Sequence, residues 1–218
     1  MSLFHYISNA LFPPKCILCG KILRKDETDL CHGCRVDSPE FPQGKLKLQF
    51  IDSFAAVWYY EGSVRKSLLR YKFYHARNLA SGYGRFLAMK AIQEAPEGFD
   101  LITWVPISSL RKLTRGYDQD ELLAKAVASE LGYAAVPTLK KIRHNPPQSG
   151  IAGQAKRRAN VLGIYRCIDE IGVQGKRILL IDDILTTGAT ASECARVLLT
   201  AGAAEVHCAV VAAVRNHK

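Results

Sequence analysis

The sequence predicts an α/β domain, built on a parallel sheet flanked by helices, that follows a small cysteine-rich module. Residues 13–47 are dense in proline, cysteine, glycine and charge, whereas sustained apolar patterning begins only near Phe50. From there, short apolar runs alternate with helical periodicity, which is typical of a parallel layer. The 218 residues can bury one sizeable core and still leave an appendage. We therefore expect two units, over residues 1–47 and 48–218.

The first half of the main domain is expected to open with strands and helices in alternation. The apolar residues between Phe54 and Tyr60 indicate a strand, and Ser63 can cap the helix that follows. The further elements of this half are a helix over 78–93, a strand over 101–106 and a helix over 118–131. This order begins a sheet whose strands are joined by helices.

The last sixty residues give the clearest pattern. Arg177 to Ile181 is a short aliphatic run typical of a buried strand, and it precedes a polar loop, a helix over 191–200 and a strand over 206–214. Ligands of such sheets bind at the carboxyl ends of the strands. The segment from His144 to Arg158 has paired prolines, glycines and basic residues without periodicity, so we expect a loop or a movable lid there.

Four cysteines near the amino end form two C-x-x-C pairs separated by eleven residues: Cys16, Cys19, Cys31 and Cys34. This spacing is close to that by which four thiolates surround one tetrahedral zinc ion. A redox dithiol would need a thioredoxin-like βαβ pattern around one pair, and the sequence has none. We predict a structural zinc site without an open coordination position. Whether this module also contacts nucleic acid stays open.

Charge and composition narrow the class of protein. The net charge is +10, and the basic surplus lies in the first three quarters of the chain. Such a surplus suits polyphosphate ligands or nucleic acid, although a solvated basic surface explains it equally well. No apolar run approaches the length of a membrane span, so we expect none. Seven cysteines, an odd number, fit a disulfide framework poorly and favour a cytoplasmic protein.

The thirteen residues from Ile178 to Thr190 combine a buried strand, two acids and a threonine–glycine loop that opens a helix. Asp182 and Asp183, at the expected strand end, can accept hydrogen bonds from the two hydroxyls of a ribose. The loop can surround a phosphate with its backbone N–H groups and hydroxyls, and its members are Thr186, Thr187, Gly188, Ala189 and Thr190. An acidic strand end followed by an ordinary helix cap is the simpler alternative.

These thirteen residues resemble the phosphoribosyl pyrophosphate motif of type I phosphoribosyltransferases. More narrowly, the whole chain resembles the competence protein F (ComF) family, which joins a four-cysteine zinc module to a phosphoribosyltransferase-like sheet. The similarity also rests on residues 111–119, on Gln148 and on residues 157–161. Where the family usually has Phe and Asn, this chain has Tyr117 and Asp118.

The resemblance implies further site residues. The turn after Val105, with Pro106, Ile107 and Ser108, would be the pyrophosphate-binding loop, and Arg111 and Arg115 would be catalytic cations near the leaving group. Asp182 and Asp183 would serve the same reaction. Magnesium would accompany phosphoribosyl pyrophosphate, held mainly by the ligand and by water. Two exposed arginines at a helix entry are the alternative for Arg111 and Arg115.

Three functions stay open at this point. The first is a phosphoribosyltransferase, although no general base stands out and His75 and His144 qualify by residue type only. The second, implied by the resemblance, is a non-catalytic DNA-uptake factor of natural transformation that binds single-stranded DNA beside a helicase-like partner. Interleaved aromatic and basic residues between Trp58 and Arg77 could bind such a strand. The third is a regulatory sensor of a sugar phosphate.

Overall fold

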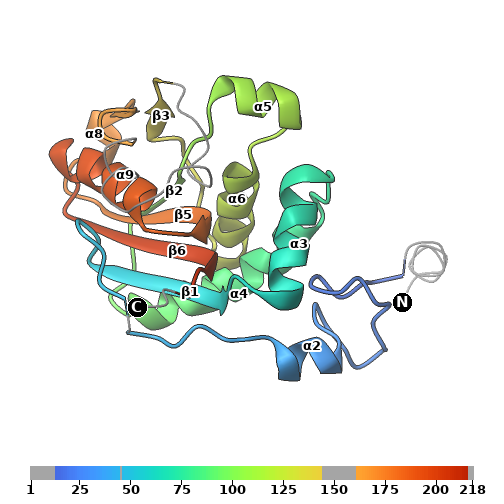
Figure 1. Ribbon diagram of the computed structural model, residues 1–218. Helices are drawn as coiled ribbons and strands as arrows, with labels where there is room; N and C mark the ends of the chain where they lie inside the picture. The colour runs from blue at the N-terminus through green and yellow to red at the C-terminus, as the bar shows by residue number, and fades with distance from the viewer. Residues whose placement is uncertain (1–12, 45, 144–160, 216–218) are drawn as a thin grey trace.

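A computed structural model describes residues 13–44, 46–143 and 161–215. Its main sheet has four parallel strands in the order β1 (Ser53–Tyr59), β6 (Glu205–Ala213), β5 (Arg177–Leu185) and β2 (Leu101–Trp104), as Figure 1 shows. The two central strands are almost wholly buried, because helices cover both faces of the sheet. The predicted α/β fold class is confirmed.

The side chains of β5 alternate between two cores. Leu179 and Ile181 face the core shared with α3 (Gly62–Phe73), α4 (Leu79–Glu94) and α6 (Gln119–Leu131). Ile178 and Leu180 face the core shared with α9 (Ala189–Thr200). This period of two is what a strand between two helical layers requires. None of the described helices is long and apolar enough to cross a lipid bilayer.

A small antiparallel pair, β3 (Leu139–Lys141) and β4 (Tyr165–Cys167), lies beside α9. Short helices complete the chain: α2 (His32–Asp37), α5 (Ser109–Arg115) and α8 (Glu170–Val173). The sequence analysis did not predict β3 and β4, because three residues are too few for a period-two pattern to be visible. Tyr165 and Cys167 belong to the same core as α9, which fixes this pair against the main sheet.

The predicted strand and helix on either side of the polar loop were both too short. The strand ends at Leu185 rather than at Ile181, because its last residues pair with β6 through Leu185 and Ala213. The helix begins at Ala189 rather than at Ala191. The loop between them is therefore tighter than expected, and both acids lie within β5 instead of following it.

The cysteine-rich module packs directly on α3 and α4. Ile17 and Leu18, which lie between the first two cysteines, are buried in the core of those helices. The Arg70 side chain of α3 donates to the carbonyl oxygens of Ile17 at 3.1 Å and Leu18 at 2.7 Å. Asp29 of the module forms an ion pair with Arg85 of α4. The division at residue 47 stays a prediction, but the two units share a core.

Candidate functional site

The two consecutive acids of β5 lie where the strand outruns its neighbour. The last residue of β2, Trp104, pairs with Ile181, so the next residues of β5 have β6 on one side only. Beyond β2 lies a cavity of about 920 Å³, and both Asp182 and Asp183 line it. Their exposed fractions are 9% and 3%, so water reaches them little. Both carboxylates thus serve one pocket.

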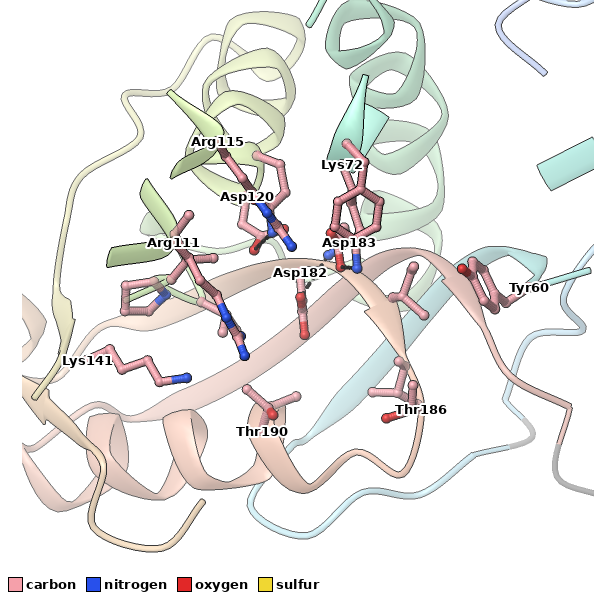
Figure 2. A pocket seen from close by; sticks show the side chains of 18 of the residues that line it. Tyr60, Lys72, Arg111, Arg115, Asp120, Lys141, Asp182, Asp183, Thr186 and Thr190 are labelled. Carbon is pink, nitrogen blue, oxygen red and sulfur yellow. Dashed lines mark hydrogen bonds and ion pairs between the residues drawn. The ribbon is translucent and has the colours of Figure 1, made fainter. Parts of the chain in front are cut away.

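A third acid, Asp120 in the first turn of α6, completes what we call the acid cluster: Asp120, Asp182 and Asp183. One carboxylate oxygen from each lies within 4.8 Å of the others. Lys72 of α3 reaches the cluster and places its ammonium 3.0 Å from Asp183 Oδ1, as Figure 2 shows. Sequence analysis missed Asp120, because acids are ordinary in the first turn of a helix. The stretch that contains Lys72 was expected to bind nucleic acid instead.

The acid cluster retains protons near neutral pH. Burial, together with the charge of Asp183, raises the pKa of Asp182 to about 7. Burial and the charges of the other two acids raise the pKa of Asp120 well above its usual range. Burial tends to lower the pKa of Lys72, but the neighbouring carboxylates outweigh it and the net shift is upward. The lysine therefore stays charged and compensates part of the buried negative charge.

Two oxygens of the acid cluster lack a hydrogen-bond partner. Within the part of the chain that the structure describes, Asp183 Oδ2 and Asp120 Oδ1 are buried and unpaired. Asp182 Oδ1 accepts from the backbone N–H of Asp183 at 2.8 Å, which fixes its orientation. An unpaired buried oxygen costs free energy, so these atoms are suited to a ligand that brings hydroxyl groups.

The threonine–glycine loop forms the opposite wall of the cavity. Thr186, Gly188 and Thr190 line it, whereas the Ala189 side chain packs into the core with α9. The buried Thr187 Oγ1 has no partner among the described residues, and Thr187 is not one of the residues that line the cavity. The loop thus presents three of its five predicted residues to the pocket.

Gly188 is required by the turn itself. Its φ of +77° lies in the left-handed region, and it is the N-cap of α9. A Cβ at this position would lie 2.6 Å from Leu48 Cδ2, in the segment that leads into β1. A glycine here also permits the close approach of a phosphate to the backbone. The structure adds that a neighbouring leucine side chain already occupies the space of a Cβ.

The turn after β2 carries the predicted cations to the cavity. Pro106 and Ile107 line it, whereas the buried Ser108 caps α5 by accepting from the backbone N–H of Arg111 at 3.4 Å. Arg111 and Arg115 of α5 also line the cavity, and Figure 2 shows both directed into it. Ser108 therefore acts on the site through the helix that it caps.

The four predicted zinc ligands converge at the other end of the molecule. The sulfur atoms of Cys16, Cys19, Cys31 and Cys34 all lie within 4.8 Å of one another. Cys31 precedes α2 and Cys34 lies within it, so the helix brings the second pair together. Four thiolates at this spacing fit one tetrahedral zinc ion.

Comparison with known proteins agrees with both ends of the molecule. The Double zinc ribbon domain family matches residues 7–45, and the Phosphoribosyl transferase domain family matches residues 121–218. The DNA utilization protein YhgH of Salmonella typhi is 28% identical over 200 residues, which cover 88% of this chain and 86% of that protein. Competence protein F of Haemophilus influenzae is 23% identical over 215 residues, covering 88% and 93%.

Competence protein ComFC of Streptococcus pneumoniae is 28% identical over 225 residues, covering 88% of this chain and 96% of that protein. The chain is thus similar to competence protein F and ComFC over most of its length. A solved structure titled as the allosteric regulatory enzyme of purine biosynthesis is 24% identical with a TM-score of 0.42. That match covers 65% of this chain but only 29% of the longer enzyme.

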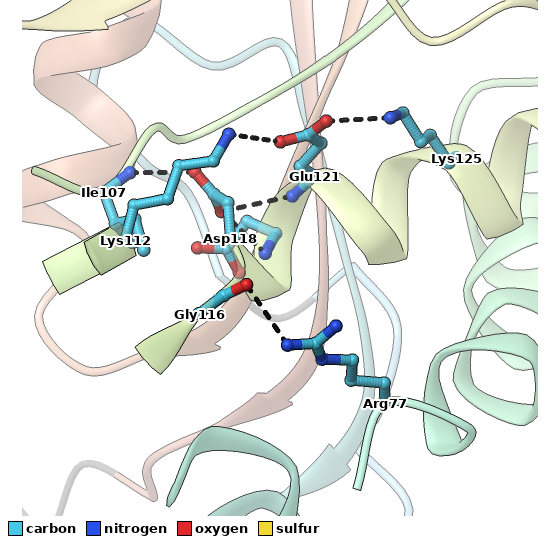
Figure 3. Close-up of polar contacts among 8 residues, drawn as sticks. Arg77, Ile107, Lys112, Gly116, Asp118, Glu121 and Lys125 are labelled. Carbon is cyan, nitrogen blue, oxygen red and sulfur yellow. Dashed lines mark hydrogen bonds and ion pairs between the residues drawn. The ribbon is translucent and has the colours of Figure 1, made fainter. Parts of the chain in front are cut away.

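Asp118 stands where the competence protein F pattern usually has Asn. Its carboxylate accepts from the backbone N–H groups of Asp120 at 3.0 Å and Glu121 at 3.3 Å, which caps α6. Figure 3 shows the contact between Asp118 and Glu121. The Asp118 carboxylate also accepts from Ile107 N at 3.3 Å. An asparagine side-chain oxygen could make the same bonds. Asp118 therefore joins the loop after β2 to α6 and does not reach the cavity itself.

The remaining predicted features fall only partly within the described residues. His75 lines the cavity, as do Tyr60, Arg65, Gln119, Lys141 and Tyr165, which the sequence analysis did not assign to it. His144, Gln148 and the predicted lid over 144–158 lie outside the described residues, as do residues 157–160 of the family motif. No signal in the sequence pointed to Lys141 or Tyr165, because only the folded structure shows that β3 and β4 lie beside the cavity.

Proposed function

We propose that this protein binds phosphoribosyl pyrophosphate together with magnesium and transfers the phosphoribosyl group to an acceptor nucleophile. The observation that carries the proposal is one cavity with three distinct walls. The acid cluster forms its floor, the threonine–glycine loop at the amino end of α9 forms one side, and the arginines of α5 form another. A sugar that bears hydroxyls in the middle and phosphates at both ends matches this arrangement.

The ribose hydroxyls are assigned to the acid cluster. Asp183 Oδ2 and Asp120 Oδ1 are buried acceptors without partners in the described chain, and two vicinal hydroxyls would supply the missing donors. Lys72 pairs with the other oxygen of Asp183, Oδ1, and this ion pair fixes the orientation of the carboxylate. Because the pKa of Asp182 is near 7, that side chain can accept or donate at physiological pH.

The single phosphate of the ligand is assigned to the threonine–glycine loop. The twelve-residue helix α9 directs its amino end to this side of the cavity, and the helix dipole favours an anion there. Thr186 and Thr190 line the same wall with hydroxyl groups. The diphosphate is then left to the opposite wall, where Arg111 and Arg115 lie.

The proposed reaction is displacement of the diphosphate at the anomeric carbon. Negative charge grows on the leaving diphosphate while the sugar becomes cation-like, so guanidinium groups at one end and carboxylates below the ring both stabilise the transition state. Magnesium, when bound, would neutralise diphosphate oxygens, and the partnerless carboxylate oxygens of the acid cluster fit a site that receives a metal-bearing ligand. The acceptor would approach from the open side of the cavity.

Calorimetry on a double variant tests the binding step. Asp182→Asn with Asp183→Asn keeps the side-chain shapes but removes two charges, and we expect it to lose phosphoribosyl pyrophosphate binding in the presence of magnesium. A matched control removes two exposed carboxylates, Asp26→Asn with Asp37→Asn, and should bind as the unchanged protein does. Undiminished affinity in the folded first variant would refute the assignment of the ribose.

Pyrophosphate release separates transfer from mere sensing. Labelled phosphoribosyl pyrophosphate is incubated with the protein, magnesium and a panel of bases or oligonucleotides, and the released pyrophosphate is followed. Release that depends on one acceptor supports the transferase. Tight binding without release for any member of the panel would favour the regulatory sensor instead.

A second candidate function, binding of single-stranded DNA, is favoured by the end of α3. Phe73 and Tyr74 are 56% and 75% exposed, whereas Trp58 and Tyr71 of the same basic and aromatic stretch are buried in the core. Arg115 lies over the Phe73 ring at 5.0 Å, next to the mouth of the cavity. Exposed aromatic rings beside cations are suited to stacked bases and phosphates.

A salt titration tests this candidate. Affinity for a fluorescent oligothymidylate should fall linearly with the logarithm of salt concentration, with a slope of about −0.7 for each phosphate contacted. Phe73→Ala with Tyr74→Ala should weaken binding, whereas Ile171→Ala, which truncates a still more exposed apolar residue on α8, should not. Affinity without a salt slope would contradict DNA binding by this surface.

A further inference from the structure

One wall of the cavity, formed by α3 and the end of β1, is not used by the sugar and the phosphates of the proposed ligand. Tyr60 follows β1 directly, and its backbone N–H donates to the carbonyl oxygen of Ala213 at 2.8 Å, which ties it to the end of β6. Tyr60 and Ile184 are both half-buried and pack against the core beneath α3. We call this surface the α3 wall, and its residues are Tyr60, Arg65, Leu69, Phe73 and Ile184.

The α3 wall lies where an attacking nucleophile must approach. In a displacement, the nucleophile and the leaving group lie on opposite sides of the reacting carbon. The diphosphate is assigned to Arg111 and Arg115 of α5. Figure 2 shows Tyr60 on the other side of Asp182 and Asp183 from Arg111. With the ribose over the acids, an acceptor on the α3 wall would therefore face the anomeric carbon from the side opposite the diphosphate.

The side chains of the α3 wall favour a flat and largely apolar molecule. Phe73 is 56% exposed and Tyr60 is half-buried, so part of each aromatic ring stays uncovered. Leu69 and Ile184, which are also half-buried, add aliphatic surface to the same wall. Aromatic and aliphatic side chains in a cavity bind planar rings through apolar contact and stacking. The acceptor is thus expected to present a ring to this wall.

Arg65 gives the α3 wall a positive charge. It lies one turn before Leu69 on α3, it is exposed, and among the described residues it takes part in no ion pair, unlike Lys72 of the same helix. Glu61, four residues earlier, pairs instead with Arg215 at 3.0 Å and does not line the cavity. A negative group on the acceptor would gain a charge-assisted contact at Arg65, whereas a positive group would be repelled.

None of the residues of the α3 wall is a carboxylate that could take a proton from an acceptor. Lys72, next to the wall, stays charged because the neighbouring carboxylates raise its pKa. His75 lies beyond Phe73, with its ring centroid 6.3 Å from that of Tyr117 in the turn before α6. A pyridine-type nitrogen needs no base, because its lone pair is already free. Its attack forms the C–N bond while the C–O bond to the diphosphate breaks, the diphosphate takes the electron pair, and no proton moves.

We propose that the acceptor is a planar nitrogen heterocycle bearing a carboxylate, which binds on the α3 wall with its ring against Tyr60 and its carboxylate at Arg65. The inference rests on the proposed function and names the class of its second substrate. The product would be a ribonucleotide whose ring carries a positive charge at the new C–N bond. The carboxylates of the acid cluster lie below the ribose and favour that charge as it forms.

The experiment compares acceptors that share a ring and differ in charge. The three pyridine monocarboxylates and their carboxamides are each supplied with phosphoribosyl pyrophosphate and magnesium, below saturation, and pyrophosphate release is followed. We expect one carboxylate to react about tenfold to a hundredfold faster than its carboxamide, the effect of one charged hydrogen bond. Arg65→Gln should remove most of this preference and leave the affinity for phosphoribosyl pyrophosphate, measured by calorimetry, unchanged. Lys66→Gln, which removes an exposed neighbouring charge that does not line the cavity, should keep the preference.

Different failures separate the two proposals. If the unchanged protein does not bind phosphoribosyl pyrophosphate, the proposed function itself fails. If it binds this ligand but uses the carboxamides equally well, or releases pyrophosphate only with an uncharged base or an oligonucleotide, the acceptor class is refuted while the proposed function stands. A preference that survives in Arg65→Gln would also overturn the inference. Tyr60→Leu removes the ring but no charge, so it should slow a carboxylate and its carboxamide alike.

Discussion

The buried charge of the Asp182 carboxylate should lower the free energy of unfolding, and removing that charge should raise it again. Asp182 is 9% exposed, and burial with the charge of Asp183 raises its pKa from 3.8 to about 7 in the folded protein. An acid with a raised folded pKa holds its proton more tightly when folded, so stability falls as pH rises from 4 through 7. Asp182→Asn cannot titrate and resembles the protonated acid. It should therefore be more stable than the unchanged protein at pH 8.

The size of the gain follows from the pKa. Between pH 5.5 and a pKa of about 7 lie roughly one and a half pH units, and each unit corresponds to about 1.4 kcal/mol. The difference in free energy of unfolding between Asp182→Asn and the unchanged protein should thus grow by about 2 kcal/mol from pH 5.5 to pH 8. The amide oxygen can still accept the Asp183 N–H, so no hydrogen bond is lost.

Urea unfolding at the two pH values measures this difference, with the fluorescence of Trp104 in β2 as one reporter. Asp26→Asn, which removes an exposed carboxylate, serves as the control and should change stability by less than about 0.5 kcal/mol at either pH. A variant at Asp182 that is no more stable at pH 8, or whose gain is the same at both pH values, would refute the argument that this acid is buried at a cost. Loss of ligand binding with a gain in stability is the pattern of a functional residue.

Three further predictions concern the surroundings of the site. Lys72→Met should lower the free energy of unfolding by about 3 kcal/mol in urea, because it leaves the buried Asp183 carboxylate unpaired. Adding Asp183→Asn should restore most of this loss, and additive losses in the double variant would argue against the ion pair. Chelating the zinc should lower the melting temperature of the whole chain by about 10 °C in calorimetry, which corresponds to roughly 4 kcal/mol, and added zinc should restore the melting temperature. A separate melting transition of the zinc module alone would contradict the core that it shares with the main domain. Gly188→Ala should lower the free energy of unfolding in urea by about 1–3 kcal/mol, because of the positive φ at this position and the contact of the new Cβ with Leu48. Adding Leu48→Ala should restore only the part of this loss that comes from the contact, and full recovery would show that the positive φ causes no strain.

The fold was predictable from the sequence because its strongest signals are local. The aliphatic run from Arg177 to Ile181 and the helix after the polar loop can bury their apolar faces only in a sheet covered by helices. The extension of β5 to Leu185 was not predictable in the same way. Asp182 and Asp183 break the apolar run, and only the pairing of this segment with β6 keeps it extended.

The site was predictable where one segment supplies it and missed where several segments meet. The acids of β5 and the threonine–glycine loop lie within thirteen residues, so their chemistry was visible together. Asp120 follows the helix cap Asp118 and looks like an ordinary first-turn acid until α6 is placed beside β5. Lys141 ends a three-residue strand, whose face toward the cavity depends on pairing with β4 more than twenty residues later.

Helix α3 gives a physical reason for joining the zinc module to this site. On the side that faces the module, Ser67 and Arg70 donate to backbone carbonyls of the first cysteine turn. Two residues further on, Lys72 reaches the acid cluster, and residues two apart on a helix point in nearly opposite directions. The helix therefore lies between the module and the cavity, and what fixes one side fixes the other. A buried ammonium balances the carboxylates only when its position is held by surrounding contacts, so the zinc module contributes to the geometry of a site that it does not touch.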